Sequence, residues 1–496
     1  MEAQRTVAVV LLGAPGSGKT ALAQALLAAA GGALARGSGL ARGSYDSRGV
    51  RVVLLDPPGD PDLAGQLHAG LRVADAVVLV VSPVQGVDAR TVALWESLEH
   101  LPRLVVLSQL DRPGADADEA VAVCQRVLGE GVLPLQLPLH DDDGSVGGLL
   151  DLLHLQVTEG SQTRAAEAEH LPLVATLRAE LVEALLTGSD DQALFEAYLD
   201  DQEPLPAVLD HELAGAVGRG DLQPVLVAVP RRGVGLTDLL ALLASALPSG
   251  RAPLPAATGP GGEPVELAAE GPLVAEVVTV GLWRVWSGSL TPGTSLIVAN
   301  QPMTYDGPAV PCGALVEVDL SGAPGDVVTA AAVEPSNVGV GDAVGSGETG
   351  ALLRLSPWPM PTAAFPVGAP ADTGLAHRVH ADPVARLETD PVTGQLLLWT
   401  YGPGHAEALL GGLPSAPVRV AAGSRPVAVR IRIPGWAERS VRSDLGARGG
   451  EVLAASADEH GVTLSAALRP VPPKYNGPTR RSGPGQRACP AAPGYR

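Results

Sequence analysis

The fold of this chain is most constrained by eight residues near its start, Gly13-Ala14-Pro15-Gly16-Ser17-Gly18-Lys19-Thr20. An apolar stretch, Thr6 to Leu12, precedes them, and a helix-forming stretch, Ala21 to Ala30, follows. Between a strand and a helix, G-x-x-x-x-G-K-[ST] predicts a phosphate-binding loop, because backbone N–H groups and the helix N-terminus surround phosphate oxygens. We expect Lys19 to reach the outer phosphates and the Thr20 hydroxyl to bind Mg²⁺.

The lysine in this loop is unusual for the chain. Of 34 basic residues, only Lys19 and Lys474 are lysines, and all the others are arginines. A compact ammonium fits between phosphates where a planar guanidinium does not. The alternative is an ordinary glycine-rich turn in a chain with 60 glycines. The retained lysine favours the phosphate site.

Composition limits the class of protein. The length of 496 residues predicts three or four domains, and the 3% aromatic content predicts aliphatic cores. A net charge of −20 disfavours unspecific nucleic-acid binding, so no direct DNA binding is expected. Three distant cysteines, Cys124, Cys312 and Cys489, suggest neither a metal cluster nor a disulfide framework. With no signal peptide and no membrane-spanning stretch, we expect a cytoplasmic protein.

The first half of the chain predicts an α/β domain. Near-continuous aliphatic strands alternate with helices in residues 1–248, which is typical of a parallel sheet with helices on both faces. The expected strands are Thr6–Leu12, Val50–Leu55, Ala76–Ser82, Arg103–Leu107 and Pro224–Val229. The expected helices are Asp62–Val73, Asp88–Leu98, Asp118–Leu128 and Thr237–Leu247. A mostly helical insert is expected at about 140–222, with Leu177, Leu181 and Leu185 as a core stripe.

The second half predicts smaller domains joined by a Pro/Gly-rich linker at 249–271. Short Val-rich strands in 272–350 predict a β-barrel. Residues 357–413 contain one hairpin, Val384–Thr400, turning at 392–394. Residues 425–468 read as a strand, a helix at Trp436–Ala447, and two more strands. The stretch 469–496 is expected to be disordered.

Two further motifs fit a nucleotide site. Asp56-Pro57-Pro58-Gly59 ends a strand, where Asp56 would hold Mg²⁺ through water and Gly59 would face a γ-phosphate. Ser108-Gln109-Leu110-Asp111 also follows a strand, and Asp111 could accept guanine N1–H and N2–H₂, which adenine does not offer. An acid in an Asp-Arg-Pro-Gly turn is also simply common, so this second motif leaves the base open.

Together these motifs resemble elongation factor G of the translational GTPase family. Four segments carry the likeness besides the loop: residues 71–96 after Gly59, residues 284–298 with Gly325-Asp326 and Gly341-Asp342, residues 387–405, and residues 427–453. The resemblance implies GTP or GDP and Mg²⁺ as ligands and the ribosome as partner. It also implies the last domain's ferredoxin-like α+β fold. The implied nucleotide site comprises Gly13, Ala14, Pro15, Gly16, Ser17, Gly18, Lys19, Thr20, Asp56, Gly59 and Asp111, with Thr20 and Asp56 at the metal.

The chain departs from the family at the other nucleotide motifs. No threonine lies between Thr20 and Asp56, where the family has one on Mg²⁺ and the γ-phosphate, and Asp60 replaces a water-orienting histidine. Ser108 and Gln109 replace an asparagine that ties this loop to the phosphate loop and a lysine that lies over the base. Pro230 stands where an alanine N–H would reach guanine O6. Each lost contact of about 1–3 kcal/mol predicts about 10²- to 10⁴-fold weaker guanine binding in total, and hydrolysis should suffer more.

Domain content departs as well. The third-domain pattern stops near Leu410 and the last begins near Arg425, and the 14 residues between them (411–424) cannot hold the family's fourth domain, so translocation is not expected. The ferredoxin-like pattern covers only half of its domain, which would leave a sheet edge for a partner to cover.

Three hypotheses follow. The chain is a GTPase that acts at the ribosome, a nucleotide-binding paralogue that docks there without hydrolysis, or a decayed copy. We favour GTP binding with weak or lost hydrolysis, and no residue is assigned as catalytic. Of the histidines, His68 lies a helix away from Gly59, and His405 fits a structural role.

Overall fold

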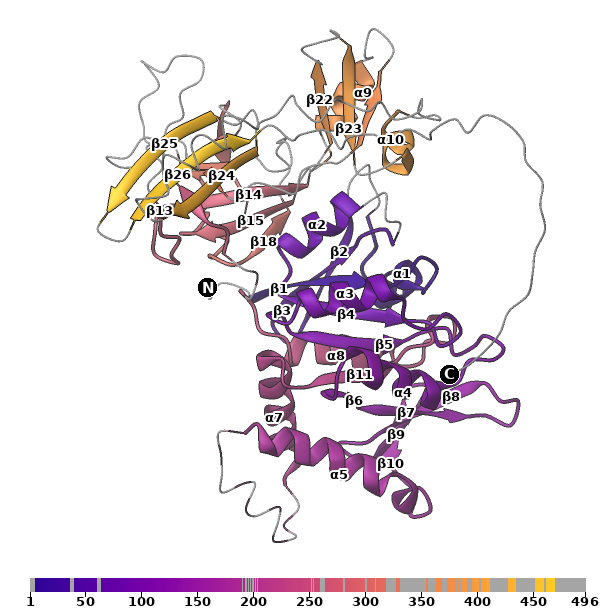
Figure 1. Ribbon diagram of the computed structural model, residues 1–496. Helices are drawn as coiled ribbons and strands as arrows, with labels where there is room; N and C mark the ends of the chain where they lie inside the picture. Colours follow the sequence, from indigo (N-terminus) through magenta and orange to yellow (C-terminus); the bar gives the residue numbers. More distant parts are fainter. Residues whose placement is uncertain are drawn as a thin grey trace, which may run out of the picture. The chain divides into compact units, whose positions relative to one another are not determined.

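The computed structural model describes most of the first 317 residues and separate segments beyond them (Figure 1). The described residues are 5–35, 40–59, 64–189, 191–317 apart from 192–193, 195, 197, 199, 201, 203, 251, 253, 259–263, 280–281, 299–300 and 308, and then 327–330, 354–355, 363–367, 373–380, 382, 385–389, 395–400, 403–410, 427–433, 451–458 and 461–468. The chain divides into two compact units, residues 1–389 with 395–416, and residues 390–394 with 417–496.

A seven-stranded sheet forms the centre of the first domain, in the order β2-β3-β1-β4-β5-β11-β6. All its neighbouring strands pair in parallel except β2 and β3, which are antiparallel. The strands are β1 (Arg5–Leu12), β2 (Ala41–Ser47), β3 (Val50–Asp56), β4 (Ala76–Val81), β5 (Arg103–Leu107), β6 (Val132–Pro134) and β11 (Gln223–Val227). The carboxyl ends of β1, β3, β5 and β11 therefore lie along one edge, where ligands bind in open α/β sheets.

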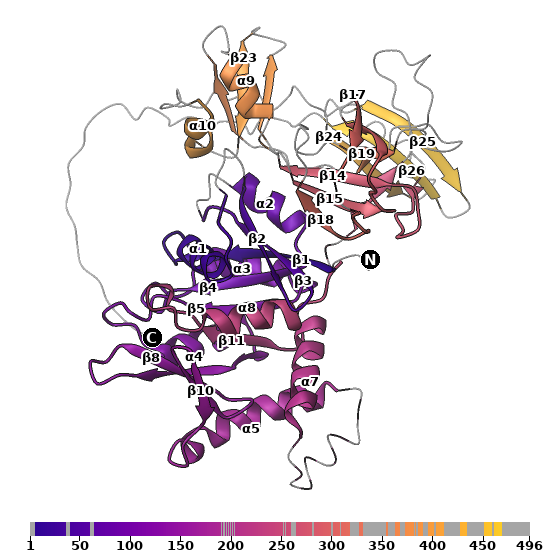
Figure 2. The same ribbon diagram turned by 180° about the vertical axis from the view of Figure 1, so that it is seen from behind.

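Helices cover both faces of this sheet, as Figures 1 and 2 show from opposite sides. Successive residues of a strand point to opposite faces. Accordingly Val7 and Val9 of β1 join one buried cluster, which includes α1 (Lys19–Ala29) and α8 (Leu236–Ser245). Their neighbours Ala8 and Val10 join a second cluster, with residues of α3 (Ala89–Ser97) and α4 (Ala117–Leu128). Aliphatic residues on both strand faces thus explain why the strands read as continuous apolar runs.

The expected fold class is confirmed: a parallel-sheet α/β domain is followed by antiparallel sheets. The five expected strands and four expected helices are present, including α2 (Ala64–Arg72), with ends shifted by up to two residues. Strand β2 was not expected, because its sequence, Ala-Arg-Gly-Ser-Tyr-Asp-Ser, is mostly polar. Polar and charged residues suit a strand at the edge of a sheet.

The expectation of a mostly helical insert at 140–222 is wrong for its first part. There β7 (Gln136–His140), β8 (Val146–Asp151), β9 (Gln156–Glu159) and β10 (Gln162–Ala165) form an antiparallel sheet. Helices α5 (Leu171–Thr187) and α7 (Pro206–Arg219) follow. Short hairpins rich in Asp and Gly lack a long hydrophobic period, so the sequence did not show them. Leu181 and Leu185 are buried as expected.

The next domain is a six-stranded antiparallel sheet in the order β17-β16-β19-β14-β15-β18. The strands are β14 (Val274–Thr279), β15 (Leu282–Ser287), β16 (Thr294–Val298), β17 (Gln301–Tyr305), β18 (Leu315–Glu317) and β19 (Val327–Ala330). Trp283 and Tyr305 lie in its core. A short sheet of β12 (Ala257–Thr258), β13 (Pro264–Val265) and β20 (Arg354–Leu355) accompanies it. Closure of the six strands into a barrel stays a prediction.

Residues 363–410 contain the expected hairpin, β22 (Arg386–Thr389) with β23 (Leu396–Thr400). Strand β21 (Ala363–Pro366) pairs with β23, and α9 (Thr373–His380) and α10 (Pro403–Leu410) complete the segment. His405 Nε2 lies 2.8 Å from Asp382 Oδ2, with both side chains 2% exposed. This buried pair is consistent with a structural role for His405.

The second compact unit contains a three-stranded antiparallel sheet, β24-β26-β25. Its strands are β24 (Val427–Ile433), β25 (Glu451–Asp458) and β26 (Gly461–Leu468). The expected helix at 436–447, the turn at 392–394, the Gly-Asp pairs at 325–326 and 341–342, and the tail at 469–496 lie outside the described residues. Among the helices that are described, none has the length and apolar character needed to cross a membrane.

Two buried carboxylates join the first domain to the β14–β19 sheet. Asp75 accepts the backbone N–H groups of Ala8 (2.9 Å) and Ala252 (3.1 Å) and pairs with Arg284 through two contacts of 2.8 and 3.1 Å. Glu276 lies 2.9 Å from Arg72 Nε at the end of α2. Helix α2 follows the Asp56–Gly59 turn in the chain. The contact of Arg72 with Glu276 therefore holds the C-terminal end of α2 against the β14–β19 sheet.

Candidate functional site

The loop after β1 passes very close to the neighbouring strand. Gly13 has φ +138°, and a Cβ on it would lie 2.3 Å from the Val80 carbonyl oxygen of β4. Gly18, with φ +101°, begins α1, and a Cβ there would lie 3.1 Å from Ser108 Oγ. Side chains at these positions would be strained or displaced, which explains the glycines of the motif.

Gly13→Ala should destabilise the chain by at least about 3 kcal/mol, because backbone strain of about 1–3 kcal/mol adds to a collision with a strand backbone. Gly31→Ala is the matched control, since Gly31 has φ +79° but no atom within 4 Å of an added Cβ. Strain alone should reduce its stability by about 1–2 kcal/mol. Urea midpoints measure both effects, and equal losses in the two variants would refute the close approach.

Lys19 is held on the inner side of the loop. Its Nζ donates to the carbonyl oxygens of Gly13 (2.7 Å) and Ala14 (3.0 Å), and only 6% of the residue is exposed. Burial lowers the pKa of Lys19, and the nearby Asp56 carboxylate opposes that shift. The two carbonyl contacts position a buried ammonium where a phosphate would meet the loop.

The Thr20 hydroxyl donates to Asp56 Oδ2 at 2.7 Å. The first turn of α1 and the last residue of β3 therefore meet, as expected. Asp56 is 5% exposed. A hydroxyl and a carboxylate are hard oxygen donors of the kind that Mg²⁺ takes alongside waters and phosphate oxygens. The donor set therefore fits Mg²⁺, which Thr20 would bind directly and Asp56 through water. In the described part of the chain, no three acidic, His or Cys side chains form a metal cluster.

Gly59 lies directly against the loop. A Cβ on Gly59 would be 2.7 Å from Lys19 Nζ and 3.0 Å from the backbone N of Pro15. A small cavity of about 40 Å³ borders this contact. It is lined by residues of the loop, the Asp56–Gly59 turn, α2 and the start of α3, among them Gly13, Lys19, Gly59, Leu67 and Arg90. Asp60, which takes the place of the family's histidine, lies outside the described residues.

The loop after β5 remains tied to the phosphate loop, which corrects the expected loss of this contact. Ser108 Oγ donates to the Ser17 carbonyl oxygen at 2.6 Å, and Gln109 Nε2 donates to the Gly16 carbonyl oxygen at 2.9 Å. Ser108 is buried, and Gln109 has φ +59°. A short hydroxyl and a longer amide thus replace the asparagine. The two side chains replace the lost contact only together, so neither substitution taken alone predicts it.

Asp111 has 27% of its side chain exposed, and Arg231 Nη1 lies 3.9 Å from Asp111 Oδ2. Arg231 belongs to a 3₁₀ turn, η2 (Pro230–Arg232), directly after β11. The structure thus brings together Asp111 and a residue that sequence analysis did not select. Their loops follow β5 and β11, which are adjacent parallel strands, and only this adjacency reveals the pair.

Comparison with known proteins agrees with this geometry. The sequence model of the family described as "Elongation factor Tu GTP binding domain" matches residues 37–249. Curated proteins named "Elongation factor G-like protein", from Mycobacterium tuberculosis strains CDC 1551/Oshkosh and ATCC 25618/H37Rv, are each 32% identical to the chain over 469 residues, which is 82% of this chain. The chain belongs to the translational GTPase family. It covers 65% of the length of these two relatives.

A solved structure supports the fold of this family member over most of its length. A crystal structure of a protein from Thermus thermophilus matches with a TM-score of 0.62 and 22% identity, covering 94% of this chain and 92% of the other. The family match begins at residue 37, after the phosphate loop. The case for that loop therefore depends on its own contacts at Lys19, Thr20 and Gly59.

The segment before β2 differs most from the family expectation. Only residues 30–40 separate α1 from β2, and Ala35 pairs with Arg42 through backbone hydrogen bonds of 2.7 and 3.1 Å. No threonine occurs in this segment or elsewhere between Thr20 and Asp56. A γ-phosphate in the loop would therefore lack the threonine contact that the family resemblance implies.

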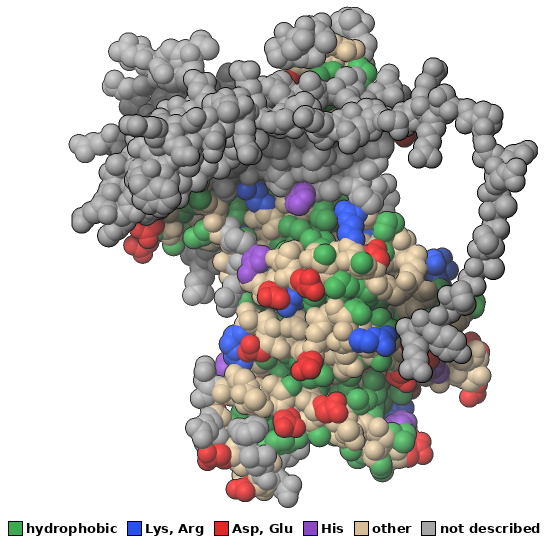
Figure 3. All heavy atoms as spheres, in the orientation of Figure 1, with side chains coloured by type: hydrophobic (Ala, Val, Ile, Leu, Met, Phe, Trp, Pro, Cys, Tyr) green, Lys and Arg blue, Asp and Glu red, His purple; other side chains and the backbone are tan. Residues whose placement is uncertain are grey.

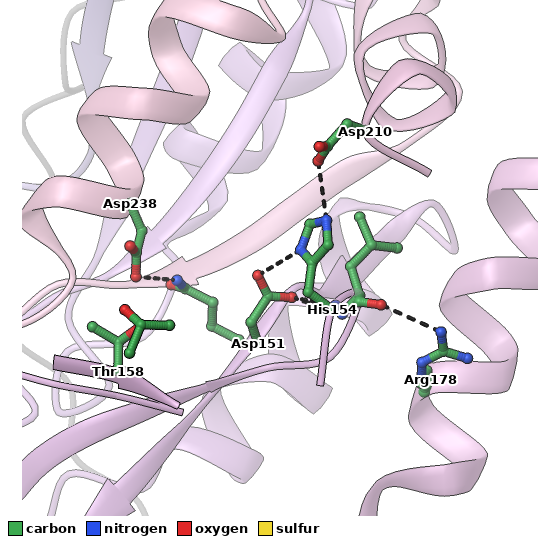
Figure 4. A network of polar contacts seen from close by, with 9 residues as sticks. Asp151, His154, Thr158, Arg178, Asp210 and Asp238 are labelled. Carbon is green, nitrogen blue, oxygen red and sulfur yellow. Dashed lines mark hydrogen bonds and ion pairs between the residues drawn. The ribbon is translucent and has the colours of Figure 1, made fainter. Parts of the chain in front are cut away.

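A second polar cluster lies in the insert (Figure 4). His154 Nδ1 is 3.0 Å from Asp151 Oδ2, and its Nε2 is 3.1 Å from Asp210 Oδ1 on α7. A neutral imidazole has one N–H, so both contacts are hydrogen bonds only when the ring is charged. The hydrogen bond to Asp151, with help from Asp210, raises the pKa of His154. Asp238 is another acid near Asp151, and burial raises the pKa of Asp238.

This cluster should stabilise the insert more at low pH. Because the folded pKa of His154 lies above the ordinary value of 6.5, its contribution is complete below that value and is lost as pH rises through the folded pKa. We expect His154→Gln to destabilise the protein by up to about 1 kcal/mol near pH ~5.5 and by less near pH ~8.5. Urea titrations at the two pH values test this, and a larger effect at the higher pH would contradict it.

Proposed function

We propose that this chain is a cytoplasmic guanine-nucleotide-binding protein of the elongation factor G type that hydrolyses GTP slowly or not at all. The proposal depends most on Lys19. Its ammonium is buried, held by two loop carbonyls and placed against Gly59, which supports a loop arranged for phosphate before any ligand binds. A pre-organised site avoids the cost of ordering its groups when a ligand binds.

Each part of the site has a role in this proposal. The backbone N–H groups of residues 13–20, except Pro15, which has none, would surround the phosphates, and Gly59 would face the γ-phosphate. Thr20 and Asp56 would hold Mg²⁺, which neutralises phosphate charge when bound. Asp111 would accept hydrogen bonds from guanine N1–H and N2–H₂. The ties of Ser108 and Gln109 keep the base loop beside the phosphate loop, so guanine affinity should fall less than the sequence alone predicts.

Slow hydrolysis follows from what the site lacks. No threonine lies between Thr20 and Asp56 to meet the γ-phosphate, and residue 60 is an acid rather than a histidine. A second negative charge beside Asp56 would repel the phosphates rather than orient water. Without these groups, the attacking water is neither positioned nor activated.

Association with the ribosome is proposed from family membership. The visible face in Figure 3 does not support it by charge, because acidic and basic side chains are interspersed there over the described residues without a continuous basic patch. The 14 residues between Leu410 and Arg425 (411–424) leave no room for the family's fourth domain, so we do not propose translocation.

Single-turnover phosphate release from bound GTP, with and without ribosomes, tests the proposal. We expect GTP and GDP to bind, with little release of phosphate in either condition. Rapid release stimulated by ribosomes would show an active GTPase and contradict the hydrolysis claim. Failure of both nucleotides to bind at millimolar concentration would refute the proposed function itself.

A further inference from the structure

We infer that Arg231 provides the hydrogen-bond donors for the O6 and N7 edge of a guanine base, in place of a backbone N–H. This inference rests on the proposed function, because it concerns how the same site selects its base.

The backbone of residues 228–230, which follow β11, offers no free N–H donor for the O6 atom of a guanine base. The N–H of Ala228 donates to the Leu107 carbonyl oxygen at 2.9 Å, and the N–H of Val229 donates to the Val234 carbonyl oxygen at 3.0 Å. Pro230 has no N–H. The first N–H beyond these three residues is that of Arg231 itself. A base whose O6 faces residues 228–230 would therefore leave this acceptor unpaired unless Arg231 reached it, and an unpaired buried acceptor is unfavourable.

Arg231 is placed to reach that acceptor. Its guanidinium lies 3.9 Å from the carboxylate of Asp111, on the adjacent loop. On guanine, the carbon that carries O6 is bonded to N1. A guanine that donates its N1–H to Asp111 therefore places O6 next to the Asp111–Arg231 contact. A donor group near Asp111 could reach O6 from there. The Arg231 side chain is 89% exposed, so it can turn from Asp111 to the base without losing buried contacts.

The chemistry of the guanidinium suits guanine. Two parallel N–H groups of arginine match the O6 and N7 acceptors, a common specific contact between proteins and guanine. Adenine carries an amino donor in place of O6, which would face the arginine donors unfavourably. Arg231 would therefore favour guanine over adenine by about 10- to 100-fold.

Its neighbour Arg232 is engaged elsewhere. Arg232 Nη2 lies 2.8 Å from Asp141 Oδ2, and Nη1 contacts Ser145 Oγ, both at the hairpin between β7 and β8. Arg232 has 37% of its side chain exposed, and its guanidinium is directed to the insert. This makes Arg232→Ala a matched control, because it removes the same charge from the same turn.

Displacement of ribose-labelled fluorescent GDP from the full chain tests the inference. The competitors are GDP, IDP, ADP and the diphosphate of 2-aminopurine riboside, which keeps N7 and lacks O6. In Arg231→Ala, we expect the preference for GDP over ADP to fall about 10- to 100-fold. GDP and IDP should lose affinity together and the 2-aminopurine nucleotide less. Arg231→Gln, which keeps an N–H donor, should fall between Arg231→Ala and wild type, and Arg232→Ala should keep the wild-type preference.

The outcomes separate the inference from the proposed function. If wild type binds GDP and Arg231→Ala keeps its preference over ADP, the inference is wrong and the proposed function stands. Equal losses for GDP and the 2-aminopurine nucleotide would also overturn it, because they would indicate a general role rather than recognition of O6. If wild type binds none of these nucleotides, both are wrong. Tryptophan fluorescence confirms that each variant is folded.

Discussion

Lys19→Ala is expected to lower the affinity for GTP and GDP by about 100-fold or more. Lys19 is the only basic side chain among the eight residues of the loop, and two carbonyl contacts hold its ammonium in place. Hydrogen bonds to charged groups contribute about 1.5–3 kcal/mol each, and about 1.4 kcal/mol is a factor of ten in affinity. Equilibrium titration with labelled GDP measures the loss.

Two further variants make this test specific. Lys474→Ala removes the chain's other lysine and should leave GDP affinity unchanged. Lys19→Arg keeps the charge but should still bind weakly, because the guanidinium does not fit the space of the ammonium beside Gly13 and Ala14. If Lys19→Ala binds GDP as wild type does, the loop is a glycine-rich turn and not a phosphate site.

Asp75→Ala should destabilise the chain by about 3–5 kcal/mol, as expected when one partner of a buried ion pair is removed. The Asp75 side chain is fully buried, and Arg284 is 1% exposed. The substitution leaves the Arg284 charge buried and also removes the acceptor of the Ala8 and Ala252 N–H groups. We therefore expect a larger loss than for an isolated surface pair.

Urea unfolding followed by tryptophan fluorescence measures this effect, since Trp95 reports on the first domain and Trp286 on the β14–β19 sheet. Asp118→Ala, which removes an exposed carboxylate from α4, is the control and should change stability by less than about 0.5 kcal/mol. Equal urea midpoints for Asp75→Ala and Asp118→Ala would show that the buried junction does not stabilise the protein.

The sequence predicted those elements whose conformation depends mainly on residues close to them in the chain. The strand Thr6–Leu12, the glycines at 13, 16 and 18 and the following helix are specified by neighbouring residues, and all are present. Strand β2 and the sheet of the insert were missed, because their residues are mostly polar or interrupted by glycine and their pairing depends on distant partners.

The base-side contacts could not be derived from sequence for a related reason. Ser108 and Ser17 are 91 positions apart, and whether a hydroxyl reaches a carbonyl depends on how β5 lies beside the loop. Substitution of the family's asparagine therefore looked like a loss. Arg231 and Asp111 are brought together only by the pairing of β5 and β11. The sequence showed which of the family's base-side residues are missing. The fold shows that Ser108 and Arg231 lie where they could replace those contacts.

An intact phosphate loop, with a base loop held to it by Ser108 and Gln109, should form a guanine-selective nucleotide site. Competition between labelled GDP and unlabelled GTP, GDP and ATP for the wild-type chain measures this selectivity. We expect GTP and GDP to displace the label at similar concentrations and ATP to require at least about tenfold more. Displacement by ATP as readily as by GTP, or no binding of labelled GDP, would show that the site does not select guanine.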